Sequence, residues 1–244
     1  MISPSFEHSP QRYARLAGLL YLAIILLGLF GEVFVRGSLV ATGDATATAA
    51  AIARSQQLWR AGIAGDLLMH VLDIPVMLFF YLLLRPVSRG LALLSTFFNL
   101  VQTAVLAVNK LTLLLPLMLL QGGGVLQQAF PAPQLHALSY LAIQAHGYGF
   151  GIGLIFFGWA CLVRGHLMRR SGYFPKALGV LLQVAGVSYL VNSFALLLAP
   201  QLASLLFPAV LVPAFIGELA LALWLIVKGV DQRQWQQRAA PCAR

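Results

Sequence analysis

Residues 61–84 read AGIAGDLLMHVLDIPVMLFFYLLL. This stretch is longer than the about 20 apolar residues that a transmembrane helix needs. Its acidic and basic side chains are Asp66, His70 and Asp73. Backbone exposed to lipid has to satisfy its own hydrogen bonds, and a single segment does so as a helix. Residues 61–84 are therefore predicted to form a transmembrane helix.

The rest of the chain repeats this apolar pattern. The 244 residues are 60% hydrophobic and 9% charged, whereas about a quarter of the residues in a soluble domain are charged. A soluble fold of this length could not bury so much apolar surface. We predict an all-α polytopic membrane protein, with one membrane domain over residues 1–244 and a bundle of six transmembrane helices. The predicted spans are residues 16–35, 61–84, 90–120, 135–163, 177–199 and 208–228.

The basic residues indicate how the chain is oriented. A net charge of +9 would favour nucleic-acid binding if these residues formed one face, but they flank the apolar runs instead. Cytoplasmic segments carry an excess of Lys and Arg, so we predict that both termini are cytoplasmic. The richer side holds Arg12, Arg15, Arg85, Arg89, Arg164, Arg169, Arg170, Lys176, Lys228, Arg233, Arg238 and Arg244, and the poorer side holds Arg36, Arg54 and Arg60.

Three connections lie on the poorer side. Residues 37–60 are rich in alanine and include Asp44, a good helix N-cap, which predicts a short helix on the outer surface. Residues 121–134 contain three glycines and end in prolines, which predicts a flexible loop. Residues 200–207 are predicted to be a short outer connection.

Ionisable side chains inside the predicted spans are costly, and they mark candidate functional sites. Helical rise places most of them about 8–18 Å below the outer helix ends, in the outer half of the bilayer. Asp66, His70 and Asp73 lie on one helix face because they are four and seven residues apart. The ionisable set is Glu32, Asp66, His70, Asp73, Lys110, His146 and Glu218.

The charges of this set do not balance, because Lys110 is its only fixed cation. Buried carboxylates need partners, so protonation of some of them, a water-filled cavity or a bound cation would be required. Histidine and carboxylate ligands suit Zn²⁺, although no compact motif such as HExxH is present. We predict a divalent metal held by Asp66, His70 and His146. Haem between His70 and His146 is disfavoured by the acidic neighbours.

The glycines that follow His146 allow two interpretations. Gly147, Gly149, Gly151 and Gly153 recur at alternate positions and include two G-xxx-G pairs. Small residues at that spacing let helices approach closely. Helix packing is the favoured interpretation, and the alternative is that these glycines leave the wall beside His146 open to a ligand.

Several short motifs resemble one membrane family. They are Arg60 with Asp66, then H-G-Y-G from His146, R-S-G-Y-F-P from Arg170, Gly217–Glu218, and W-L-I-V-K-G from Trp224. Together they resemble the bacterial membrane proteins grouped as domain of unknown function 4386, over nearly the whole chain to Gly229. The resemblance implies a six-helix protein of the bacterial inner membrane and no particular activity. It also directs attention to Asp66, His146 and Glu218.

Three functions remain open. The first is a metal-dependent membrane enzyme, hydrolase-like, acting on a lipid or small molecule that enters from the outer leaflet. Asp73 or Glu218 would be its general base, and Lys110 would stabilise developing negative charge. The second is a proton- or cation-coupled transporter, which is disfavoured because the inner half offers few polar residues beyond Asn99 and Gln102. The third is a structural or partner-binding protein whose polar residues only hold helices together.

Overall fold

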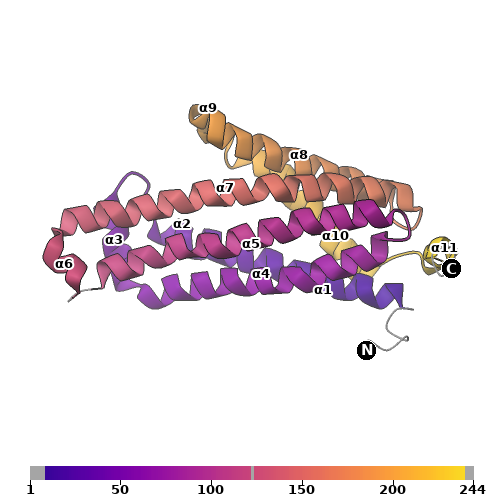
Figure 1. Ribbon diagram of the computed structural model, residues 1–244, viewed down its shortest axis with the longest axis horizontal. Coiled ribbons are helices and arrows are strands. Elements are labelled where there is room, and N and C mark those ends of the chain that lie inside the picture. The colour runs from indigo at the N-terminus through magenta and orange to yellow at the C-terminus, as the bar shows by residue number, and fades with distance from the viewer. Residues whose placement is uncertain (1–8, 122–123, 240–244) are drawn as a thin grey trace. The chain divides into compact units, whose positions relative to one another are not determined.

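The computed structural model describes residues 9–121 and 124–239, and these residues are helical apart from short connections. Six helical segments are long and apolar enough to cross a membrane, which confirms the predicted all-α, six-span architecture (Figure 1). The spans are Pro10–Leu39, Gln56–Leu84, Arg89–Leu120, Ala132–Ser171, Lys176–Leu198 and Ala209–Val227.

The first span is built from three helical pieces, and shorter helices join or follow the other spans. The elements are α1 (Pro10–Leu29), the π-helix η1 (Phe30–Arg36), α2 (Gly37–Leu39), α3 (Ala45–Arg54), α4 (Gln56–Leu84), α5 (Arg89–Leu120), α6 (Val125–Ala129), α7 (Ala132–Ser171), α8 (Lys176–Leu198), α9 (Pro200–Leu206), the 3₁₀ turn η2 (Ala209–Leu211), α10 (Val212–Val227) and α11 (Gln232–Ala239).

Helix packing divides the chain into two compact units, which are described separately. Unit 1 contains residues 1–23, 72–103 and 151–244, and unit 2 contains residues 24–71 and 104–150. Each unit therefore combines parts of several spans. The prediction of a single membrane domain stays a prediction.

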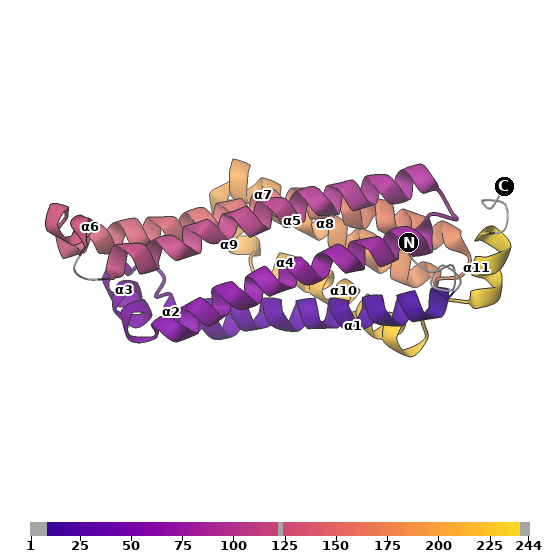
Figure 2. The ribbon, with the colours of Figure 1, turned by 60° about the horizontal axis from the view of Figure 1, so that its bottom comes forward.

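Unit 2 is built on an apolar core beneath the short helix α3. The Asp44 side chain accepts a hydrogen bond from the Ala47 N–H at 2.8 Å and caps α3, as the sequence predicts. Trp59 is buried, and its indole N–H donates to the Leu113 carbonyl at 2.8 Å. In Figures 1 and 2 the unit 2 portions of α5 and α7 run side by side. The core residues are Val35, Leu39, Ile52, Trp59, Ile63, Leu113 and Leu117.

In unit 1, α7 and α8 approach each other through two reciprocal glycine pairs. A Cβ atom on Gly158 would lie 2.9 Å from the Gly186 carbonyl oxygen, and a Cβ on Gly186 would lie 2.7 Å from that of Gly158. The second pair lies seven residues along each helix. A Cβ on Gly165 would lie 2.5 Å from the Gly179 carbonyl oxygen, and a Cβ on Gly179 would lie 2.6 Å from that of Gly165. Each glycine therefore lies against the backbone of the other helix.

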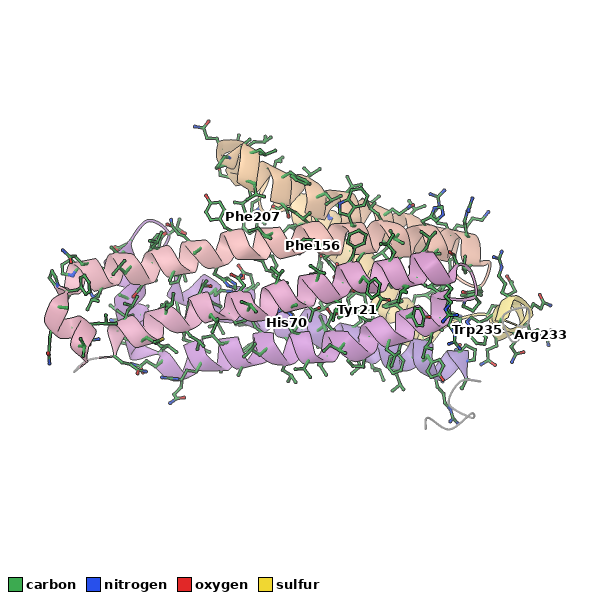
Figure 3. All side chains as sticks on the ribbon, viewed as in Figure 1. Tyr21, His70, Phe156, Phe207, Arg233 and Trp235 are labelled. Carbon is green, nitrogen blue, oxygen red and sulfur yellow. The ribbon has the colours of Figure 1, made fainter. Side chains whose placement is uncertain are left out.

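The last described helix, α11, packs within unit 1 through one aromatic side chain. Trp235 is buried, and its indole N–H donates to the Leu83 carbonyl at 3.2 Å. The Tyr173 hydroxyl donates to the same carbonyl at 2.6 Å, and burial raises the pKa of Tyr173. Figure 3 shows Trp235 and the exposed Arg233 on α11.

The helix bounds differ from some of the predicted spans and connections. Residues 200–206 form α9, because Pro200 is favourable in the first turn of a helix. The fourth span continues well past residue 163, to Ser171. The predicted loop 121–134 contains the short α6, and its residues 122 and 123 lie outside the described residues. His8 and Cys242 also lie outside the described residues. Cys161 is described and is buried.

Candidate functional site

The six predicted site residues fall into both units. Unit 2 contains Asp66, His70, Lys110 and His146, whereas unit 1 contains Asp73 and Glu218. Although Asp66 and Asp73 share a helix face on α4, they have different partners. Two sites must therefore be considered: the Asp66 cluster (Glu32, Arg36, Asp66 and Lys110) and the Asp73–Glu218 cluster (Asp73, Asn99, Thr103, Arg164, Tyr189 and Glu218).

Asp66 lies between two cations. Its Oδ2 atom accepts hydrogen bonds from Arg36 Nη1 at 2.7 Å and from Lys110 Nζ at 2.9 Å. The side chains of Asp66 and Lys110 are only 1% and 4% exposed. The predicted charge imbalance is therefore wrong for this residue, because Arg36 was placed outside the first predicted span, which ended at residue 35. In the structure, Arg36 is the last residue of η1 and belongs to the first span.

The π-helix η1 positions Arg36 and Glu32. Arg36 Nε donates to Glu32 Oε2 at 2.7 Å, and the Glu32 side chain is 63% exposed. Gly31 allows α4 to approach, because a Cβ atom there would collide with Asp66 Oδ1 and lie 3.1 Å from Arg36 Nη2. π-Helical turns are rare, and those that occur are often at functional sites. Here the π-helix brings the cation Arg36 to the buried Asp66 and pairs it with the exposed carboxylate of Glu32.

The two predicted histidine ligands are both buried in unit 2. Nε2 of His70, labelled in Figure 3, has no hydrogen-bond partner among the described residues. The Asn109 amide nitrogen lies 3.0 Å from His146 Nδ1 and also donates to the His146 carbonyl at 2.9 Å. The same Nδ1 atom lies 3.5 Å from the Asn109 backbone carbonyl oxygen, so whether it donates or accepts depends on the tautomer of the ring. A Cβ on Gly149 would collide with the Asn109 amide, which supports packing at this glycine.

A metal-ligand set is not assembled around these histidines. Within the described ranges, no group of three or more His, Cys, Asp and Glu side chains could hold a metal ion. The cations Arg36 and Lys110 beside Asp66 also oppose binding of a further cation. The divalent metal stays a prediction.

Asp73, in unit 1, is held by neutral donors. Its Oδ2 atom accepts hydrogen bonds from the Thr103 hydroxyl and, at 2.9 Å, from Asn99 Nδ2. Asn99 also donates to Gln102 Oε1 at 2.8 Å, and its own Oδ1 accepts from Arg164 Nη2 at 2.5 Å. Asn99 is fully buried. It therefore bridges a guanidinium and a carboxyl through a neutral amide.

Arg164 is a buried cation inside α7. It is 2% exposed, its guanidinium lies 4.4 Å from the centre of the Phe80 ring, and its Nε has no hydrogen-bond partner among the described residues. The sequence placed Arg164 just after the fourth predicted span, whereas the structure buries it within α7. Its helical phase is the missing signal, because Arg164 shares one buried face with Cys161, three residues before it, and Met168, four residues after it.

Glu218 completes the unit 1 group. Its Oε1 atom accepts a hydrogen bond from the Tyr189 hydroxyl at 2.6 Å. Gly217, the preceding residue, lets α10 approach α8, because a Cβ there would lie 2.8 Å from the Leu181 carbonyl oxygen. Arg164 lies within electrostatic range of both Glu218 and Asp73. Sequence reasoning missed Thr103 and Tyr189, because neutral hydroxyls are common in membrane helices.

Comparison with known proteins supports the resemblance noted from the motifs. An uncharacterized protein of Archaeoglobus fulgidus is 29% identical to this chain over 168 residues, which are 68% of this chain and 83% of that protein. No solved structure matches. The inner membrane and the side that holds the termini stay predictions. A family model described as "Domain of unknown function (DUF4386)" matches residues 16–229, and the chain therefore belongs to this family of membrane-type helical proteins.

Proposed function

We propose that this protein is a proton- or cation-coupled membrane transporter in which Asp73 and Glu218 exchange the coupling ion. The observation that supports it is the contrast between the buried carboxyl groups. Asp66 has two cationic partners, whereas the hydrogen bonds found for Asp73 and Glu218 come from the neutral donors Asn99, Thr103 and Tyr189. A carboxyl held only by neutral donors can exchange a proton or metal cation without first breaking an ion pair.

The charge of Arg164 supports the exchange of one proton or monovalent cation at the two carboxyl groups. One guanidinium lies within range of two carboxyls, and no described salt bridge joins it to either. One carboxylate balances this cation. The second carboxyl is balanced when it carries a proton or a monovalent cation, because an uncompensated charge in low dielectric is costly. The cluster is therefore suited to hold one exchangeable ion.

The polar side chains of unit 1 also support the proposal. The transporter was disfavoured because few polar residues were expected beyond Asn99 and Gln102. Unit 1 adds Thr103, Arg164 and Tyr189 to its buried or half-buried polar side chains. Carboxyls in contact with such side chains are typical of proton relays in membrane transporters.

Proton uptake into proteoliposomes tests this proposal. The purified protein is reconstituted with an internal pH-sensitive dye, and proton flux is recorded under an imposed potential as solutes are added in panels. We expect solute-dependent flux in the wild type, and background flux in Asp73→Asn and Glu218→Gln, because an amide cannot carry the coupling ion. Asp44→Asn is the matched control, because asparagine preserves the helix cap and Asp44 lies in unit 2. No flux in the wild type, or equal flux in all variants, would contradict the proposal.

The metal-dependent enzyme is the second candidate, and the unpartnered Nε2 of buried His70 is the observation that favours it. A free imidazole nitrogen can ligate a transition metal such as Zn²⁺. Elemental analysis of purified protein is the test. Near-stoichiometric metal that is lost in both His70→Ala and His146→Ala would support this candidate. Metal at background level in the wild type would rule it out for the purified protein.

A further inference from the structure

We infer that the Asp66 cluster binds the phosphate of a phospholipid headgroup, with Arg36 as the contacting residue. This site lies in unit 2 and does not depend on the proposed transport function. The inference begins with two positive charges that meet at one buried carboxylate. Arg36 and Lys110 share a single buried carboxylate, and both contact the same oxygen, Asp66 Oδ2. Lys110 alone can compensate Asp66.

The positive charge of Arg36 is then matched only by a carboxylate at the surface of unit 2. Among the described ion pairs, Glu32 is the other partner of Arg36, and its side chain is 63% exposed. An exposed ion pair between residues four apart on a helix contributes little to stability. Arginine binds phosphate through two parallel charge-assisted hydrogen bonds, which are stronger than ordinary ones. A phosphate can therefore replace the Glu32 carboxylate on Arg36.

The surroundings of Glu32 favour a lipid over a free phosphate ion. The next two side chains, Val33 and Phe34, are 56% and 67% exposed, so an apolar surface adjoins the ion pair. Arg36 lies three residues before the end of the span Pro10–Leu39, about 5 Å along the helix axis. At 1.5 Å per residue this span of 30 residues is about 45 Å long, whereas the hydrocarbon core is about 30 Å thick, so the end of the span can reach the phosphate groups just beyond the core. Acyl chains would cover Val33 and Phe34 while the headgroup reaches Arg36.

Native mass spectrometry of detergent-purified protein with added phosphatidylglycerol tests this inference. We expect retained lipid adducts in the wild type, several-fold more of them in Glu32→Gln, and far fewer in Arg36→Gln. Glu32 is exposed, so Glu32→Gln should fold and keeps the inference testable if Arg36→Gln does not. Arg60→Gln is the matched control, because Arg60 is an exposed arginine of the same unit outside the cluster.

Three results would overturn the inference. Unchanged or weaker lipid retention in Glu32→Gln would show that Glu32 does not occupy the phosphate position. An equal loss in Arg60→Gln and Arg36→Gln would show unspecific attraction to basic residues. Binding of inorganic phosphate in the absence of any lipid adduct would assign the cluster to a soluble anion.

Discussion

Replacing Asp66 by alanine should destabilise the protein by about 3–5 kcal/mol, the usual cost of removing one partner of a buried ion pair. Arg36 and Lys110 would then remain in unit 2 without the carboxylate that both contact. Lys110 would be affected most, because its side chain is only 4% exposed and cannot easily reach water. Reversible unfolding in mixed micelles, followed by circular dichroism, measures the free energy of unfolding.

Glu32→Ala provides the control within the same cluster. It removes a carboxylate from the same arginine, but at an exposed position, so the expected loss is below about 1 kcal/mol. A double variant, Asp66→Leu with Lys110→Met, should recover most of the stability, because well-packed apolar residues can replace a buried ion pair at little cost. Equal losses in Asp66→Ala and Glu32→Ala would contradict the burial argument.

Gly165→Leu should prevent unit 1 from folding, and Gly165→Ala should cost about 1–3 kcal/mol through overpacking. A Cβ atom on Gly165 would lie 2.5 Å from the Gly179 carbonyl oxygen and 2.7 Å from Gln183 Cγ. Gln183 could move, but the α8 backbone at Gly179 could do so only by separating the helices. The yield of monodisperse protein on size exclusion and its free energy of unfolding are the measurements.

Gly147→Ala is the matched control for Gly165→Ala on the same helix. A Cβ atom at Gly147 meets nothing within 4 Å. Alanine is a better helix former than glycine by about 1 kcal/mol, so this change should be neutral or stabilising. If both substitutions had the same effect, helix propensity would explain the results and close packing of α7 on α8 would not.

The sequence is sufficient to predict the six spans and α3, because each of these depends on a local property. Apolar runs identify the six spans, and Asp44 identifies the start of α3. Span ends are harder to predict, because hydropathy falls before the helix ends. The apolar run of the fourth span stops at residue 163, yet α7 continues to Ser171 and buries Arg164.

The partners of the polar residues could not be predicted, for a geometric reason. Helical rise gives the depth of a residue, and depth alone made Asp66, Asp73 and Glu218 seem to be one site. Contact also depends on rotation about the helix axis, by about 100° per residue, and on which neighbouring helix lies there. On α5, Thr103 donates to Asp73, and Lys110, seven residues later, donates to Asp66. One helix pair thus contributes to two different networks.

The π-helix Phe30–Arg36 also limits how this region can change in length. A π-helical turn accommodates more residues per turn than an α-helical one. Deleting one residue between Phe30 and Arg36 would let α1 continue as an ordinary α-helix, and the later side chains would keep nearly the same face, because six α-helical residues turn about as far as seven π-helical ones. Deleting one residue within α1 would instead rotate the side chains before it by about 100° relative to those after it, and thus relative to Arg36, Val35 and Leu39 in unit 2. A single deletion should therefore be tolerated better within the π-helix than within α1.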